Sequence, residues 1–351
     1  MATTPITSLT HGHIDRFGPT ADGFATISGW IFRELEALDR VDITLDQKPW
    51  QQDLGLFDRP DVPAAYESFL GFRPHITKSG FNLTKPLPSG ITNLAQTRIE
   101  IAPYTSSGQR LDPFISYFRS TDDQTASSSL PPVELQERVG GSHNFSVISA
   151  GLTSLIITQM QKYKPDFLSS RILDWGCGCG RVISQLLKFV PPDRLYGCDI
   201  DTEAIRWNHQ NLRGPTFTRI DPYPPTEYAS HFFDSIYGIS VMTHLSEETQ
   251  LLWLRELKRI SAPGAVLALS VIGRNLRQTN MPVSLADGFK TRGFASWIPA
   301  YSQMLDEFSR PEYYQESYHS LEYIEKTWGK YFQVLEYAEA GHQDIVLLRN
   351  D

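Results

Sequence analysis

ILDWGCGCGRV, at residues 172–182, combines a short apolar run, an acid and three alternating glycines just before a helical pattern. It predicts a strand that ends in a turn without side chains, where backbone N–H groups meet a ligand at a helix N-terminus. A second strand with an acidic end, LYGCDID, follows at residues 195–201. Strand, glycine turn, helix, strand and terminal acid make up half of a nucleotide-binding α/β sheet.

The chain beyond residue 133 alternates between helical and strand patterns. We predict helices over residues 133–164, 181–190, 202–212 and 246–260, and strands near residues 172, 195, 217, 233–241, 265–272, 331–337 and 344–348. This alternation predicts a doubly wound, Rossmann-like α/β fold whose parallel sheet is covered on both faces. The ligand is then expected at the carboxyl ends of the strands.

The chain before residue 118 has a different pattern of short alternating runs separated by Gly, Pro and Asp, which is typical of a small antiparallel β-sandwich. Its Trp30 is a candidate either for stacking on a sugar ring or for the sandwich core. We predict a β-sandwich accessory domain over residues 1–118, a polar linker over 119–132 and the α/β domain over 133–351. The aromatic-rich residues from about 273 to 330 are expected to form a substrate cap inserted in that domain.

Composition excludes several classes of function. The 32 basic and 40 acidic side chains give a net charge of −8, which argues against a nucleic-acid or anionic-membrane surface. The chain lacks a secretory pattern and any apolar stretch near the roughly 18 residues of a spanning helix, so we expect a cytoplasmic protein. The three cysteines all lie in the two predicted ligand-binding turns, and no metal-like spacing is evident. We therefore predict neither disulfides nor a metal.

Asp174, Gly176, Gly178 and Gly180 resemble the first motif of the class I S-adenosylmethionine-dependent methyltransferases, an acid followed by Gly-x-Gly-x-Gly. This spacing differs from the dinucleotide fingerprint Gly-x-Gly-x-x-Gly, which favours S-adenosylmethionine over a nicotinamide cofactor. The resemblance covers roughly residues 133–351. The runs WGCGCGR, SVMTHL and QDIV are similar to a bacterial methyltransferase subgroup with an N-terminal β-domain, often associated with glycan or secondary-metabolite gene sets.

The resemblance implies a set of cofactor-binding residues. Asp174 is expected to accept hydrogen bonds from the glycine turn or from the cofactor's ammonium group. Gly176 and Gly178 permit close approach of the backbone to the cofactor, and Gly180 permits close packing of the helix.

The second strand end supplies further candidates. The carboxylate of Asp199 can accept both ribose hydroxyls, whereas Asp201 better fits a helix N-terminal acid. Ile200 is expected to wall the adenine, and Ser240 lies where the fourth strand opens into the site.

Candidate catalytic and substrate residues lie elsewhere. His244 could act as general base on a hydroxyl or amine, or it could cap the next helix. His319 in the insertion is the rival base. Tyr313 and Tyr314 are candidates to line the substrate pocket or to pack inside the cap. Arg138 could bind the cofactor carboxylate or an anionic substrate through a bidentate pair, or lie on the surface.

We predict methyl transfer from S-adenosylmethionine to a hydroxyl or amine of a small-molecule acceptor, such as a glycan or secondary metabolite. Three alternatives remain open at this stage: C-methylation of an isoprenoid or aromatic acceptor, a non-catalytic binding scaffold, and a nicotinamide-dependent dehydrogenase.

Overall fold

The computed structural model describes residues 10–20, 24–33, 36–63, 78–91, 97–117, 130–140, 145–273, 281–299, 313–338 and 343–351. Most of the predicted linker, residues 119–129, lies outside this described part, and so does much of the predicted insertion.

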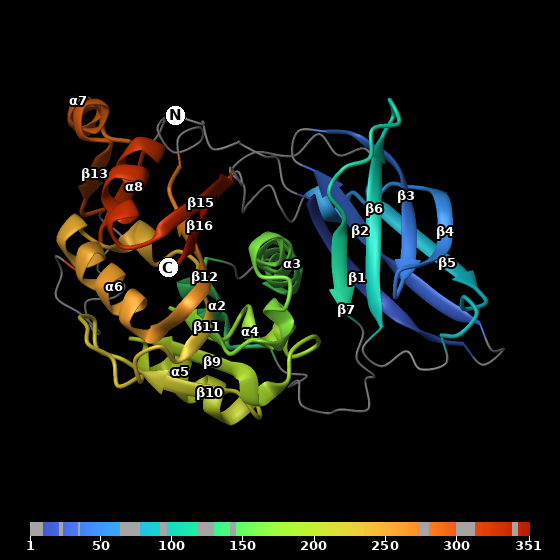
Figure 1. Cartoon of the computed structure of the whole chain (residues 1–351), viewed down its shortest axis with the longest axis horizontal. Coiled ribbons are helices and arrows are strands. Elements are labelled where there is room, and N and C mark those ends of the chain that lie inside the picture. The colour runs from blue at the N-terminus through green and yellow to red at the C-terminus, as the bar shows by residue number, and fades with distance from the viewer. Residues whose placement is uncertain are drawn as a thin grey trace.

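The described N-terminal residues form two antiparallel sheets (Figure 1), with strand orders β1–β2–β5 and β4–β3–β6–β7. The strands are β1 Thr10–Pro19, β2 Ala25–Arg33, β3 Leu38–Leu45, β4 Lys48–Gly55, β5 Gly80–Lys85, β6 Arg98–Thr105 and β7 Phe114–Tyr117. Ile27 and Phe81 from the first sheet share one apolar core with Ile43 and Ile101 from the second. The predicted antiparallel sheets are therefore confirmed. Trp30 is 1% exposed and belongs to the interior, so it offers no face to a sugar.

The described strands of the C-terminal part form one sheet in the order β10–β9–β8–β11–β12–β16–β15. They are β8 Ile172–Trp175, β9 Leu195–Asp199, β10 Thr216–Arg219, β11 Phe233–Gly238, β12 Ser261–Val271, β15 Gln333–Ala338 and β16 Asp344–Arg349. Strands β8 to β12 are parallel, and β16 is antiparallel to both of its neighbours. The chain moves outward from β8 to β10 and then crosses to β11, so the order reverses between β8 and β11. Ligands bind at such a reversal.

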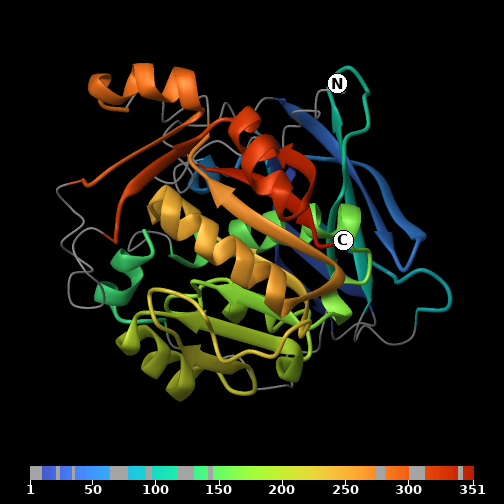
Figure 2. The ribbon, with the colours of Figure 1, turned by 60° about the vertical axis from the view of Figure 1, so that its left-hand side comes forward.

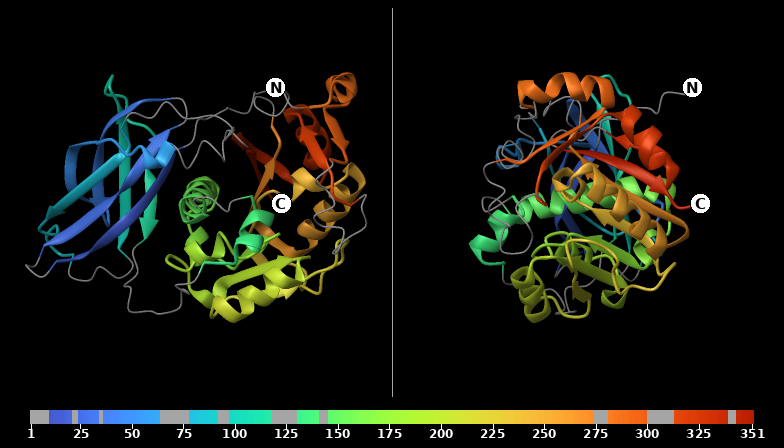
Figure 3. Two further views of the ribbon diagram at one scale, coloured as in Figure 1. Left: turned by 180° about the vertical axis from the view of Figure 1, so that it is seen from behind. Right: turned by 90° about the vertical axis from the view of Figure 1, so that its left-hand side faces the viewer.

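Helices cover both faces of this sheet (Figures 2 and 3). The helices are α2 Val133–Arg138, α3 Phe145–Tyr163, α4 Ile183–Leu186, α5 Thr202–Asn211, α6 Glu247–Ile260, α7 Val283–Arg292 and α8 Leu321–Thr327, with short 3₁₀ turns η1 Phe167–Ser169, η2 Pro192–Arg194, η3 Met242–His244 and η5 Trp328–Lys330. Successive strand residues point to opposite faces. Accordingly, Ile172 and Ala268 pack with α3, α4 and α5, whereas Leu173 and Leu267 pack with α6 and α8. The predicted doubly wound architecture is confirmed.

Helix α3 connects the two parts of the molecule. It packs on the C-terminal sheet and also contacts β1 and β7 of the N-terminal sheets, and Figure 1 shows it between them. The N-terminal sheets therefore lie on the α3 side of the C-terminal sheet, away from α6.

The described residues between β12 and β15 form a small additional unit. Strands β13 Phe294–Trp297 and β14 Glu316–His319 pair antiparallel. Ile324 and Trp328 bury themselves against α6, within the same apolar cluster as the sheet face. This packing fixes β14 beside the loop that follows β11.

Two predicted helices differ from those observed. The expected helix over residues 133–164 is interrupted by Gly140, whose φ of 78° is left-handed and ends α2. The expected helix over residues 181–190 is regular only in α4. Across residues 184–190 the backbone bonds mix i−4 and i−3 partners, as in Leu186 N–H to Val182 O and Phe189 N–H to Leu186 O.

Candidate active site

A cavity of about 490 Å³ lies at the carboxyl ends of β8, β9 and β11, where the strand order reverses. Its walls come from the loops after these strands, from α2 and from the segment leading into β14. The lining residues are Glu137, Arg138, Val139, Gly140, Asp174, Trp175, Gly176, Cys177, Gly178, Arg181, Val182, Asp199, Ile200, Asp201, Ile220, Ile239, Ser240, Val241, His244, Leu245, Trp253, Ile272, Tyr313, Tyr314, Glu316 and Gln343.

The glycine turn after β8 is fixed by hydrogen bonds to neighbouring elements. The amides of Gly176 and Cys177 donate to the carbonyl of Cys198 at 2.8 and 3.0 Å, which joins the turn to β9. The side-chain amide of Asn208 in α5 donates to the carbonyl of Gly178 at 2.7 Å. The turn therefore keeps its shape without a ligand.

The conformation of this turn requires glycine. Gly176 and Gly178 have φ values of 77° and 49°, a region that side chains disfavour. A Cβ at Gly176 would collide with Val241, and one at Gly178 with Val139, whereas Gly180 lies against α5. Glycine at these two positions lets Val241 and Val139 pack directly on the turn, and the backbone of the turn, which we call the glycine cradle, lines the cavity.

Asp199 is held by two backbone amides at the end of β9. Its Oδ2 accepts from Gly178 N at 2.7 Å, and its Oδ1 accepts from Asp201 N at 2.9 Å. Desolvation in the cavity raises the pKa of Asp199 to about 6, although these two amides oppose the rise. The carboxylate is therefore fixed in orientation at the cavity wall.

Asp174, at the end of β8, is 4% exposed. Burial raises its pKa to about 8; nearby Asp199 raises it further, while Arg181 opposes the rise. Two desolvated carboxyl groups on one wall favour a ligand that carries positive charge.

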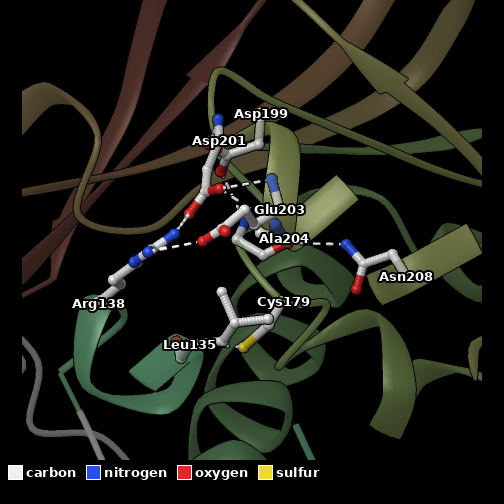
Figure 4. A network of polar contacts seen from close by, with 9 residues as sticks. Leu135, Arg138, Cys179, Asp199, Asp201, Glu203, Ala204 and Asn208 are labelled. Atoms are coloured by element: carbon white, nitrogen blue, oxygen red, sulfur yellow. Dashed lines mark hydrogen bonds and ion pairs between the residues drawn. The ribbon is translucent and has the colours of Figure 1, made fainter. Parts of the chain in front are cut away.

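Arg138 differs from its sequence prediction (Figure 4). Its Nη1 donates to Asp201 Oδ2 at 2.9 Å, and its Nη2 donates to Glu203 Oε2 at 2.7 Å. Asp201 Oδ1 in turn accepts from the amides of Glu203 and Ala204, as an N-cap of α5. Arg138 lines the cavity, but its guanidinium is committed to protein carboxylates and joins α2 to α5. A ligand carboxylate at Arg138 would have to compete with these two ion pairs.

His244 lies on η3 and is clamped by the segment before β14. Its Nδ1 is 3.1 Å from the carbonyl oxygen of Gln315, and its backbone carbonyl accepts from Gln315 N at 2.9 Å. Its ring stacks on Tyr314 with centroids 4.2 Å apart and planes at 17°. Because a carbonyl only accepts, Nδ1 carries the proton, and the neutral ring has its lone pair on Nε2.

His319, the rival base, is not brought to the cavity. It is fully buried against Phe294 and Trp328, and burial lowers its pKa to about 3. Its Nε2 is 2.9 Å from Gln250 Oε1. We therefore do not propose His319 as a base, because a proton acceptor must reach the substrate.

His319 instead supports the loop that carries His244. Gln250 accepts from His319 and donates through Nε2 to the carbonyls of Met242 and Leu245, at 2.9 and 3.0 Å. These carbonyls flank His244 in the chain. The pair of His319 and Gln250 is thus a buried brace behind the cavity.

Tyr313 and Tyr314 both line the cavity, but toward different ends. Burial raises the pKa of each tyrosine. The charge of Asp199 raises the pKa of Tyr313 further, and the charge of Glu316 raises the pKa of Tyr314 further. Tyr313 therefore lies toward the Asp199 end, and Tyr314 toward His244.

Ser240 occupies a strained position in the cavity wall, with a φ of 60°. Its amide donates to Ser270 Oγ at 2.7 Å, and Gln343 Nε2 donates to its Oγ at 2.9 Å. Ser270 Oγ also donates to Gln343 Oε1 at 2.7 Å. This closed ring ties the ends of β11 and β12 to the start of β16.

Sequence reasoning missed the two buried charged residues Arg181 and Glu316 of the cavity, and also Glu137, which is exposed at its edge. Arg181 directly follows Gly180 and is 8% exposed, and Glu316 opens β14 and is 6% exposed. The signal for Arg181 was its place inside the quoted motif. No sequence pattern indicated Glu316, because its side chain lines the cavity only through the pairing of β13 with β14.

Across the described ranges, no group of three or more His, Cys, Asp and Glu side chains is arranged to hold a metal ion. No described helix is long and apolar enough to cross a membrane. All three cysteines are free and buried.

Residues 173–267, from β8 into β12, match a family model described as a methyltransferase domain. Solved structures similar to this chain include a magnesium protoporphyrin IX methyltransferase from Synechocystis PCC 6803, with 16% identity, 62% of this chain and 94% of that chain covered, and a TM-score of 0.41. Another is a 1,6-didemethyltoxoflavin-N1-methyltransferase from Burkholderia thailandensis, with 11% identity, 66% of this chain and 97% of that chain covered, and a TM-score of 0.42. Among the curated proteins compared, none matches.

The cavity residues fit S-adenosylmethionine. The fixed carboxylate of Asp199 lines the cavity, and a buried nitrogen of Arg181 lacks a hydrogen-bond partner within the described chain. The cavity lies at the carboxyl ends of parallel strands, where α/β proteins bind nucleotide-type ligands. Residues 173–267 therefore carry a methyltransferase domain.

Proposed function

We propose that this enzyme methylates a hydroxyl or amine of a small-molecule acceptor, with His244 as the general base. The observation that carries this proposal is the contact of His244 Nδ1 with the Gln315 carbonyl, in the same cavity as the glycine cradle. When bound, S-adenosylmethionine supplies an electrophilic methyl carbon. The Nε2 atom of the neutral His244 ring takes the proton that the acceptor loses.

We assign the cofactor-binding roles as follows. The fixed carboxylate of Asp199 accepts the ribose hydroxyls, and Asp174 faces the ammonium group. The cradle of Gly176 and Gly178 accommodates the part of the cofactor between these two acids. Ile200 walls the adenine.

The acceptor end depends on how firmly His244 is held. The stacked Tyr314 ring and the Gln315 backbone fix the imidazole plane, and the brace through Gln250 fixes the loop below it. A base held in one orientation loses little freedom at the moment of transfer. Ser240, beside this loop, helps to shape the junction between the two ends.

The chemistry of the cavity favours a polar acceptor of modest size. Its volume of about 490 Å³ is within the range of small-molecule pockets, and the cofactor takes a large part of it. Glu316 adds a carboxylate that can accept from acceptor hydroxyls or amines. A sugar-bearing or other secondary metabolite fits these demands. In this proposal residues 1–118 are accessory, 119–132 are a linker, and residues 273–330 cap the acceptor end of the domain over 133–351.

The test is a His244→Gln variant assayed for S-adenosylhomocysteine formation against a panel of hydroxyl- and amine-bearing metabolites. We expect kcat to fall by about a hundredfold or more, while affinity for S-adenosylhomocysteine, measured by calorimetry, stays within about threefold. Tyr314→Phe keeps the stacked ring and is the matched control, with kcat within about threefold of wild type. Unchanged kcat in His244→Gln would contradict the proposal.

A second candidate is C-methylation of an isoprenoid or aromatic acceptor. Trp175 and Trp253 lie 5.1 Å apart on the cavity wall, beside Tyr313, and aromatic faces stabilise cationic intermediates. NMR of the methylated product separates the two reactions, because only the second forms a new C–C bond.

A further inference from the structure

Arg181 is a buried cation without a full set of partners. Its side chain lines the cavity and is 8% exposed, and its Nη1 has no hydrogen-bond partner within the part of the chain that the structure describes. Burying an unsatisfied arginine nitrogen is costly in free energy. Such a group calls for an explanation, and a ligand that completes its hydrogen bonds is one that fits a cavity wall.

The neighbouring carboxyl group of Asp174 indicates which kind of ligand could bind at Arg181. Asp174 lines the same cavity, and the two groups influence each other electrostatically: Arg181 opposes the rise in the pKa of Asp174. Because Asp174 and Arg181 share one desolvated wall, they suit the end of a ligand that carries one positive and one negative charge. The amino-acid end of S-adenosylmethionine is a zwitterion of this kind, and its carboxylate is the anion that a guanidinium binds best.

The other arginine of the cavity is already committed. Arg138 donates to Asp201 and Glu203 across the gap between α2 and α5. Binding a ligand carboxylate there would require breaking both ion pairs, whereas Arg181 Nη1 would gain a partner.

We propose that Arg181 binds the α-carboxylate of the cofactor's amino-acid end, with Asp174 facing the ammonium group beside it. This inference rests on S-adenosylmethionine as the cofactor and is independent of His244 and of the acceptor. It makes Arg181 a specificity residue for cofactors that retain the carboxylate.

The experiment uses calorimetry on the whole chain with two ligands. One is S-adenosylhomocysteine, and the other is its decarboxylated analogue, S-adenosyl-3-thiopropylamine, which lacks only the carboxylate. Wild type should bind the first about ten- to a hundredfold more tightly, as a charged hydrogen bond in a desolvated site warrants. Arg181→Met should lose that preference by weakening only the carboxylate-bearing ligand, with the analogue held within about threefold. Arg138→Met, the matched control, should keep the wild-type preference.

Three results would overturn the assignment. They are equal binding of the two ligands by wild type, equal weakening of both by Arg181→Met, and loss of the preference in Arg138→Met. If circular dichroism finds Arg181→Met unfolded, Arg181→Lys replaces it. The lysine retains the charge but loses the planar fork, so we expect a preference reduced about three- to tenfold. A fully retained preference in that variant would mean that the guanidinium itself is not what selects the carboxylate and would also contradict the assignment. Because no step measures turnover, failure here is distinct from failure of His244 as the base.

Discussion

The two ends of the cavity are built in different ways. The cofactor end comes from residues close in sequence, since Gly178 and Asp199 are 21 residues apart and meet through a backbone amide. The acceptor end is assembled from distant segments. His244 and Gln315 are 71 residues apart, and Leu245 accepts from Ser317 across 72 residues.

This difference means that cofactor binding and the positioning of His244 depend on different sets of contacts. Backbone bonds between β8 and β9 hold the cofactor end, and most side-chain substitutions elsewhere leave these bonds unchanged. The acceptor end depends on how β14 and α6 pack against η3, so a change there alters His244 without touching Asp199. We therefore expect the two ends to respond separately to mutation, and the predictions below test this separation.

The largest expected effect concerns pH and the buried acids of the cofactor end. The pKa of Asp174 is raised to about 8 and that of Asp199 to about 6, from the ordinary aspartate value of 3.8. A raised acid pKa stabilises the fold fully below pH 3.8, and this stability is lost as pH rises through the folded pKa. The free energy of unfolding of the ligand-free protein should fall by roughly 7 kcal/mol between pH 4 and pH 8.5, with the larger part coming from Asp174.

Asp174→Asn provides the control for this pH effect, because the amide keeps the size of the side chain but does not titrate in this range. Denaturant melts at several pH values should give the variant a much shallower fall in stability than wild type. Parallel curves for the two proteins would mean that other groups cause the pH dependence.

The next effect is the loss of cofactor affinity in Asp199→Ala. The variant removes a fixed carboxylate that accepts from two amides and, in our proposal, from the ribose. Charged hydrogen bonds of this kind contribute about 1.5–3 kcal/mol each, so the Kd for S-adenosylhomocysteine should rise about a hundredfold or more by calorimetry. The exposed Asp193, in η2 before the same strand, gives the control Asp193→Ala, whose affinity should stay within about twofold. A small change in Asp199→Ala would remove its assignment to the ribose.

The cofactor end could be predicted from sequence because its geometry is local. An acid, alternating glycines and a second acid after a strand leave few ways to arrange the backbone. The Asp174, Gly176 and Asp199 positions therefore meet at one cavity as expected. The sheet followed from alternating patterns for the same reason, since strand and helix periods depend on nearby residues.

The remaining site residues depend on packing that no local pattern encodes. His244 and His319 are the same residue type in similar polar contexts, but the register that pairs Phe294 with His319 buries one of them completely. Arg138 and Arg181 also differ because of packing: Arg138 pairs with two carboxylates of α5 and its N-cap, whereas Arg181 Nη1 has no partner in the described chain. Whether an arginine meets a protein carboxylate depends on how α2 lies against α5, and the sequence does not state this.

A smaller effect is expected at the brace behind the acceptor end. Gln250→Leu keeps the side-chain size but leaves the carbonyls of Met242 and Leu245, and His319 Nε2, without their partner. This should lower stability by about 1–3 kcal/mol and reduce methyl transfer roughly tenfold by loosening His244. Affinity for S-adenosylhomocysteine should stay within about twofold by calorimetry. A parallel loss of that affinity would show that the two ends are coupled and would break the comparison.

The smallest effect should come from Arg138→Gln. The variant removes ion pairs to Asp201 and to the half-exposed Glu203, and partly exposed pairs contribute little, so we expect a stability loss of about 1 kcal/mol. Asp201 N would still donate to Asp199, so affinity for S-adenosylhomocysteine should change by less than about threefold. Glu203→Gln is the matched control and removes only the more exposed pair. If Arg138→Gln instead lost as much affinity as Asp199→Ala, the carboxylate of the cofactor would belong to α2, and the cofactor end would no longer be the local assembly described above.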